Sequence, residues 1–179
     1  ILGAIFCLAN PAGAFLVVHA TSHGLPECDA PIVMILQNSM ASLISYPVGH
    51  LSDKISRKSM LLLCSFLMVS ANIVMFSSHS LSLVYVGLVL WGLQFGLNQS
   101  LLFAEIASHV PKGLRGTGFA IFYLVAAVCL YLTNAAAGYI KAEYGSNAIY
   151  AFCGSFALLG LIFLLFMKNT TTETIQRDS

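Results

Sequence analysis

The side chains best suited to bind a small molecule are amides and a phenol set inside long apolar stretches. The candidates for such contacts are Asn10, Gln37, Asn38, Gln94, Asn98, Tyr123 and Asn134. At about 100° per residue, Gln94 and Asn98 share one face of a helix, and Tyr123 and Asn134 share a face of the next. These groups hydrogen-bond without charge, which suits a neutral or zwitterionic solute. Contacts between helices are an equally good interpretation for Gln94 and Asn98, and a better one for the others.

A second group of candidate residues is charged and lies in one short polar segment. Residues 49–58 hold an acid and three cations in a chain where charge is scarce: Asp53, Lys54, Arg57 and Lys58. Asp53 is suited to accept hydrogen bonds from a helix N-terminus, which carries a partial positive charge. Gly49, at the start of the segment, would let two helices approach closely. The alternative is an ordinary cationic loop that orients the chain in a membrane.

Glu105 is the one acid placed inside an apolar stretch, where an unpaired carboxylate is costly. It lies six residues before Pro111, close to the end of that stretch. We favour an ion pair with Arg57 or Arg115, and a proton-coupling site is the alternative. If Glu105 is paired, proton coupling requires a histidine or residues outside this chain.

The histidines and cysteines lack the spacing of a metal or disulfide site. His19 and His23 are four residues apart, but we expect the helix to end between them, and no third ligand lies nearby. The five cysteines are scattered, with no C-x-x-C pair. No cofactor is therefore predicted. His19 alone is near enough to the end of an apolar stretch to sense pH, so protons stay a candidate ligand.

The composition predicts the elements that must position these residues. Of the 179 residues, 58% are hydrophobic and 8% are charged, whereas about a quarter of a soluble domain is charged. The apolar stretches do not alternate with polar residues, which favours helices in a lipid bilayer. We expect six spans, each about the length that crosses a bilayer core, at residues 2–20, 31–51, 60–76, 81–107, 116–140 and 148–167, followed by a polar tail at 168–179. A net charge of +1 gives no reason to expect nucleic acid as a partner.

The positions of Lys and Arg predict which ends of the spans face the cytoplasm. Seven of the eight lie at 50–59, 108–115 and 168–179, and the breaks on the other side contain only Lys141. Cytoplasmic loops are enriched in these residues. We expect a multi-pass protein of the plasma membrane, which in a bacterium is the inner membrane, with the tail in the cytoplasm. Asn10-Pro11 is expected to kink the first span, as suits a gating helix.

Two loops resemble those of a known transporter family. Gly49-x-Leu51-x-Asp53-Lys54-x-x-Arg57-Lys58 resembles the loop between the second and third helices of each half of the major facilitator superfamily, with Ser56 where the family often has Gly. Pro111-Lys-Gly-Leu-Arg-Gly-Thr-Gly118 is similar to the loop before the fifth helix of the C-terminal half. The resemblance implies an all-α membrane fold, with six transmembrane helices as two inverted three-helix repeats, half of a twelve-helix protein. The N-terminal six-helix half is then a missing partner.

The resemblance implies secondary active or facilitative transport of a small solute by alternating access. The cluster of Gly49, Asp53, Lys54, Arg57 and Lys58 would latch the two halves in the outward-facing state. The alternative is a six-helix membrane protein that does not transport by itself, either a sensor-like relative or one part of a split protein that assembles with another chain. An enzyme is not expected, because the sequence contains no triad, carboxylate pair or phosphate-binding loop.

Overall fold

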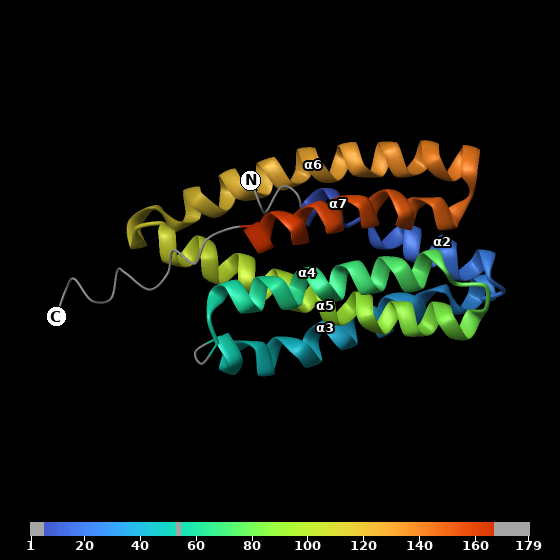
Figure 1. Ribbon diagram of the computed structural model, residues 1–179, viewed down its shortest axis with the longest axis horizontal. Coiled ribbons are helices and arrows are strands. Elements are labelled where there is room, and N and C mark those ends of the chain that lie inside the picture. The colour runs from blue at the N-terminus through green and yellow to red at the C-terminus, as the bar shows by residue number, and fades with distance from the viewer. Residues whose placement is uncertain (1–5, 53–54, 167–179) are drawn as a thin grey trace.

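The computed structural model describes residues 6–52 and 55–166, which form helices joined by short connections (Figure 1). A helical stretch at 6–8 comes first. It is followed by α2 (Gly13–Ser22), α3 (Ala30–Ser52), α4 (Arg57–Phe76), α5 (Leu81–His109), α6 (Arg115–Tyr144) and α7 (Ser146–Phe166), with the 3₁₀ turns η1 (Glu27–Asp29) and η2 (Lys112–Leu114) before α3 and α6. The predicted all-α class is confirmed. Within the described ranges, five helices are long and apolar enough to cross a membrane, and the first apolar helical stretch is shorter.

The ends of two helices follow from single residues. Ser56 caps the start of α4, because its side chain accepts a hydrogen bond from the backbone N–H of Ser59 at 3.3 Å. A serine at this position therefore has a local structural role. The apolar run of α6 ends before Lys141, yet the helix continues to Tyr144. It ends at Gly145, whose φ of +87° glycine adopts without steric cost.

The first predicted span, 2–20, is interrupted in the structure rather than kinked. Residues 10–12 are not helical, and they separate the stretch at 6–8 from α2. Pro11 has no N–H to donate to the preceding turn, and its ring disfavours helical geometry at Asn10. The backbone N–H of Ala12 donates instead to Oδ1 of Asn134, on α6, at 2.9 Å. The side chain of Asn134 thus supplies the acceptor that a continuous helix would have supplied.

Helices α3 and α5 pack with their backbones close together at two glycines of α5. A Cβ atom added at Gly92 would lie 2.6 Å from the carbonyl oxygen of Gln37, and one at Gly96 would collide with the carbonyl oxygen of Ala41. The two glycines, one helical turn apart, therefore allow the backbones of α3 and α5 to pack closely. At Gly49, by contrast, an added Cβ would meet nothing within 4 Å in the described part of the chain. The close approach expected there is not made within these residues.

The apolar core of the bundle surrounds α4 and α5. One cluster of buried residues includes Phe6, Met68 and Leu97, and a second includes Leu16 and Trp91. A smaller third cluster joins α6 to α7. The remaining surface of α6 is largely apolar and exposed, and so is much of α3. These two helices therefore offer apolar surface to lipid or to another protein segment.

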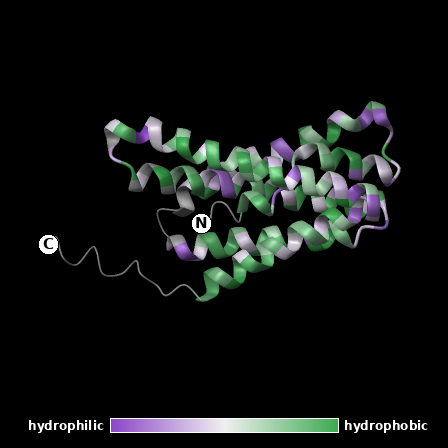
Figure 2. Ribbon diagram, turned by 90° about the horizontal axis from the view of Figure 1, so that it is seen from above, coloured by the Kyte–Doolittle hydropathy of each residue, from purple (hydrophilic) through white to green (hydrophobic). Residues whose placement is uncertain are grey.

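The helices alternate in direction, so their connections gather at two ends (Figure 1). The end of α2, the α4–α5 turn and the α6–α7 turn lie together at one end. Residues 55–56 and η2 lie at the other. Figure 2 shows hydrophilic residues mainly toward these ends, with hydrophobic residues along most of the helix lengths. This alternation is the one that the sequence predicts from its breaks.

Candidate functional site

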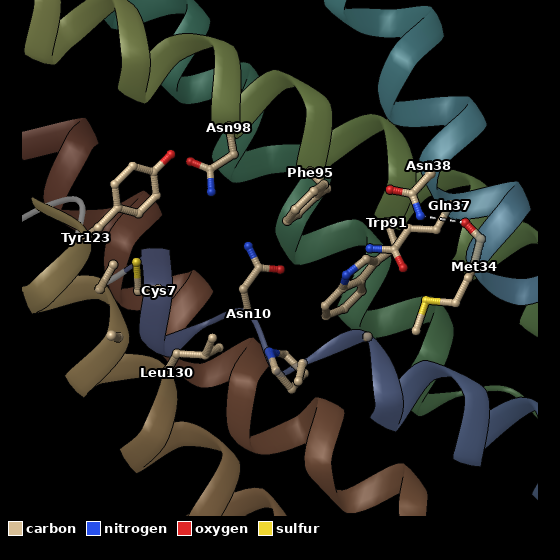
Figure 3. Close-up of a pocket in the computed structure, with 15 residues that line it drawn as sticks. Cys7, Asn10, Met34, Gln37, Asn38, Trp91, Phe95, Asn98, Tyr123 and Leu130 are labelled. Atoms are coloured by element: carbon tan, nitrogen blue, oxygen red, sulfur yellow. Dashed lines mark hydrogen bonds between the residues drawn. The ribbon is translucent and has the colours of Figure 1, made fainter. Parts of the chain in front are cut away.

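A cavity of about 570 Å³ lies among residues 7–13, α3, α5 and α6 (Figure 3). Its volume is in the range of sites for small molecules. Five of the predicted binding residues line it: Asn10, Gln37, Asn38, Asn98 and Tyr123. Residues far apart in the sequence thus meet around one space, as the polar faces of the spans predict.

The interruption of the first span exposes part of the cavity wall. Asn10, Pro11, Ala12 and Gly13 all line the cavity, and they lie where the helix is broken or just restarted. Asn134 does not line the cavity. It accepts the hydrogen bond from Ala12 and thereby holds this segment against α6. Its role in the described structure is to position the wall, and no direct contact with a ligand is indicated.

Three amides of the cavity wall have oxygen atoms with no hydrogen-bond donor. Oδ1 of Asn10, Oε1 of Gln37 and Oδ1 of Asn98 are buried and have no partner among the described residues. The side chains of Gln37 and Asn98 are each only 7% exposed. A buried acceptor without a donor costs about 1–3 kcal/mol, so each of these groups requires a donor from water or from a bound solute.

Asn38 and Tyr123 complete the polar part of the wall in a different manner. Nδ2 of Asn38 donates to the carbonyl oxygen of Met34, one turn earlier in α3, at 2.8 Å. Figure 3 shows the Tyr123 hydroxyl pointing toward the amide of Asn98 from across the cavity. The two residues come from α6 and α5, so movement of one helix relative to the other changes their separation.

Gln94 does not belong to the cavity, contrary to the prediction that it shares a binding face with Asn98. Its side chain is fully buried, and its Nε2 donates to the sulfur of Met68, on α4, at 3.3 Å. It does not appear among the residues that line the cavity. The two amides are about 40° apart around α5, and this angle suffices to place one in the cavity and the other against α4.

The sequence reading missed the aromatic part of the wall. Trp91 and Phe95 both line the cavity, and Trp91 is 2% exposed. They lie seven and three residues before Asn98, so all three fall on one face of α5. The spacing of these aromatic residues from Asn98 was the sequence signal that could have placed them in the cavity wall. They give the cavity an apolar surface beside its amides.

The cavity wall carries no charge in the described part of the chain, because its lining residues include no Asp, Glu, Lys, Arg or His. Bound charge would therefore have no counterion there. The chemistry that remains is hydrogen bonding by amides and a phenol, and contact with aromatic and aliphatic surface. This arrangement is suited to binding and orienting a solute, and its described lining residues include no nucleophile paired with a base.

The predicted gating residues are only partly visible. Asp53 and Lys54 lie outside the described residues, and the side chains of Arg57 and Glu105 are likewise outside the description, so the expected ion pair of Glu105 stays a prediction. Arg115 is exposed at the first residue of α6, and Lys58 is half-buried near the start of α4. Both lie at the end of the bundle opposite the α4–α5 turn.

Comparison with known proteins shows a family and a relative that this chain resembles. A family model described as Major Facilitator Superfamily matches residues 2–178. Monosaccharide-sensing protein 3 from Arabidopsis thaliana is 37% identical over 109 residues, which make up 60% of this chain and 15% of that protein. The matched region is thus a small part of that relative's length.

Proposed function

The chain belongs to the major facilitator superfamily, and on that premise we propose that it forms one wall of a transporter that moves a small solute across a membrane by alternating access. The family and the long apolar helices make it an integral, multi-pass membrane protein. In this proposal the six-helix chain is the C-terminal half, built as two inverted repeats of three helices. The N-terminal half packs against it and closes the other side of the cavity.

The exposed apolar surfaces of α3 and α6 support the proposal that a second six-helix half packs against this chain. Apolar side chains project from both helices into space that the described residues leave open, including Ile35 and Leu43 of α3, and Leu124 and Tyr131 of α6. The cavity lies between these same two helices. A second six-helix unit covering that side would enclose the cavity and bury part of this surface, at about 25 cal/mol per Å² of apolar area.

We further propose that the solute is neutral and rich in hydrogen-bond donors, and that a monosaccharide fits it best. The observation that carries this is the set of three donor-less amide oxygens, of Asn10, Gln37 and Asn98, around an uncharged cavity. A sugar hydroxyl donates to such oxygens, and the apolar face of a sugar ring packs on the rings of Trp91 and Phe95. The name of the Arabidopsis relative supports the same class of solute.

Binding by the complete protein tests this assignment. We expect neutral monosaccharides to compete with one another for a saturable site in the purified protein, and uronic acids or amino sugars of the same size to compete at least tenfold less well. Tenfold corresponds to about 1.4 kcal/mol. Equal competition by the charged analogues would contradict a site formed by uncharged amides.

A sensor that binds the solute without moving it is the second candidate. The Arabidopsis relative is named for sensing. A sensor predicts saturable monosaccharide binding without exchange of solute across a sealed bilayer, whereas a transporter predicts both. Counterflow in proteoliposomes distinguishes the two.

A further inference from the structure

A hydrogen-bond network at the end of the bundle where α2, the α4–α5 turn and α7 meet has no part in the solute cavity. At its centre His19 is fully buried, with Nε2 2.7 Å from Oγ of Ser78. The hydroxyl of Ser78 donates a hydrogen bond to the carbonyl oxygen of Met75 at 2.7 Å. Nε2 of His19 must therefore donate to Ser78. Its Nδ1 is buried without a partner in the described structure, so His19 is held as one neutral tautomer.

The neighbouring His23 is held in a different way. Its Nδ1 lies 2.8 Å from the carbonyl oxygen of His19, and its Nε2 lies 3.0 Å from the carbonyl oxygen of Ser78. A carbonyl oxygen only accepts, and a neutral imidazole has one N–H to donate. The hydroxyl of Ser22 lies 2.8 Å from the carbonyl oxygen of His19 and 3.2 Å from Nδ1 of His23, so it can donate to either. The imidazolium is the one form of His23 that donates to both carbonyl oxygens.

His23 lies where the C-terminal ends of two helices meet. It is the C-cap of α2, and Ser78 follows Ser77, the C-cap of α4. Helix C-termini carry a partial negative charge on their free carbonyl groups and stabilise cations nearby. Asn147 of α7 reaches the same place, where its Nδ2 donates to the carbonyl oxygens of Phe76 and Ser78 at 3.1 and 3.3 Å. Two helix C-termini therefore converge on one imidazole.

The titratable groups packed in this network are two histidines and a tyrosine. The ring of His19 lies 4.4 Å from that of His23 and 4.7 Å from that of Tyr150, measured between centroids. The other ionisable groups at this end of the described bundle make no hydrogen bond or ion pair with His23: Glu27, Cys28, Asp29, His79, Lys141, Glu143 and Tyr144. Its contacts are thus with backbone carbonyls, with Ser22 and with His19 alone.

We propose that His23 is a proton-binding residue, and that its imidazolium form clamps the end of α2 to the α4–α5 turn. Loss of the proton leaves one ring nitrogen and one carbonyl oxygen facing each other as two acceptors, so one of the two contacts is lost. Histidine is the side chain that changes charge between about pH 5 and 8. The clamp is therefore closed while His23 is an imidazolium and released when it loses a proton.

The clamp is connected to the cavity in two ways. Helix α2 is short, and the residues at its opposite end, Ala12 and Gly13, line the cavity beside the chain break. In addition, Tyr150 contacts both the ring of His19 and, at 5.8 Å between centroids, the ring of Trp91, which lines the cavity. A proton bound at His23 thus acts on one end of α2, and the other end of α2 forms part of the cavity wall, whatever solute the cavity binds.

Two measurements on the complete protein in lipid nanodiscs test the clamp. Nitrogen-15 NMR of labelled histidines reports directly whether both nitrogens of His23 are protonated. Amide hydrogen exchange of residues 13–22, corrected for the intrinsic effect of pH, reports whether α2 loosens when the proton leaves. We expect two protonated nitrogens at about pH 5.5, and exchange in α2 that rises by tenfold or more as His23 becomes neutral.

Three variants distinguish the role of His23 from the roles of His79 and Ser78. H79Q is the matched control, because His79 is exposed in the same turn and makes no hydrogen bond in the described structure. It should behave as the wild type. S78A should also keep the pH dependence, since His23 uses the backbone carbonyl of that residue. H23Q should exchange rapidly in α2 at every pH, with the other helices still protected.

The proposal is overturned by any of three results. These are a His23 with a single protonated nitrogen at about pH 5.5, exchange in α2 that does not change when His23 loses its proton, or loss of the pH dependence in S78A, which would assign the titration to His19. The NMR measurement uses the wild-type chain and therefore holds even if H23Q fails to fold.

Discussion

Individual side chains of similar chemistry have distinct roles in this protein, according to which neighbour they face. Asn98 and Gln94 are one helical turn apart on α5, and each has an amide oxygen without a donor. Asn98 lines the cavity, whereas Gln94 contacts Met68 of α4. Asn134 holds the chain break through Ala12, although its type and spacing suggested a ligand contact.

Replacing each amide of α5 by leucine should separate these roles. We expect N98L to weaken solute binding by at least tenfold, because a buried acceptor that a solute hydroxyl would satisfy is lost. Q94L is the matched control. It should leave the affinity within about twofold and keep or raise stability, because it removes a buried acceptor that has no donor. Equilibrium binding and thermal unfolding of the complete protein measure both effects, and an equal loss of binding in the two variants would contradict the placement of Gln94.

The sequence alone could not show which neighbouring helix each of these side chains contacts. Spacing fixes the angle between Gln94 and Asn98 but not the direction in which α4 approaches α5. That direction depends on packing around Met68 and Leu97, which only the folded structure shows. The uncharged, amide-rich character of the cavity was predictable, because it follows from residue types within the spans.

At the level of helices, the bounds of several helices could be predicted closely, because apolar runs are continuous and end at polar residues. The expected span 31–51 is α3, Ala30–Ser52, and the expected span 148–167 is close to α7, Ser146–Phe166. The error at the end of α6 arose because Lys141 and Glu143 were read as a loop. Charged residues are compatible with a helix that extends beyond the lipid, and the helix ends at Gly145.

The crossing of α3 and α5 should tolerate no side chain at its tightest point. In G96A the new Cβ would meet the backbone of Ala41, where the neighbouring atoms cannot turn away as a side chain can. We expect a loss of about 1–3 kcal/mol in the free energy of unfolding, as for other overpacked cores. G138A is the control, since a Cβ there meets nothing within 4 Å and alanine favours a helix. Thermal unfolding in detergent compares them, and equal midpoints would contradict the close crossing.

For the whole molecule, the alternation of the helices places the connections at two ends with different charge. Arg115 and Lys58 lie at one end of the described bundle, and Lys141 lies at the other. From the positive-inside rule we expect the first end to face the cytoplasm. The shape of the bundle does not fix this orientation, because a bundle turned over has the same packing.

Labelling of single cysteines in otherwise cysteine-free protein tests the orientation. We expect a cysteine at Ser80, in the α4–α5 turn, to react with an impermeant reagent added outside intact cells, and a cysteine at Ser59, near the start of α4, to react only after the membrane is opened. Both serines are exposed in the structure, so accessibility within the fold is matched. The reverse pattern would invert the assigned sidedness and with it the cytoplasmic position of residues 49–58.

Counterflow of a labelled neutral monosaccharide is the most direct test of the central claim, that this chain forms the wall of a solute pathway. The complete protein would be reconstituted in liposomes loaded with unlabelled sugar, with N98L as the comparison. We expect transient accumulation of label by the wild type, and a reduction of at least tenfold in N98L. Saturable binding without any counterflow would contradict transport, and counterflow that N98L leaves unchanged would contradict the assignment of the cavity.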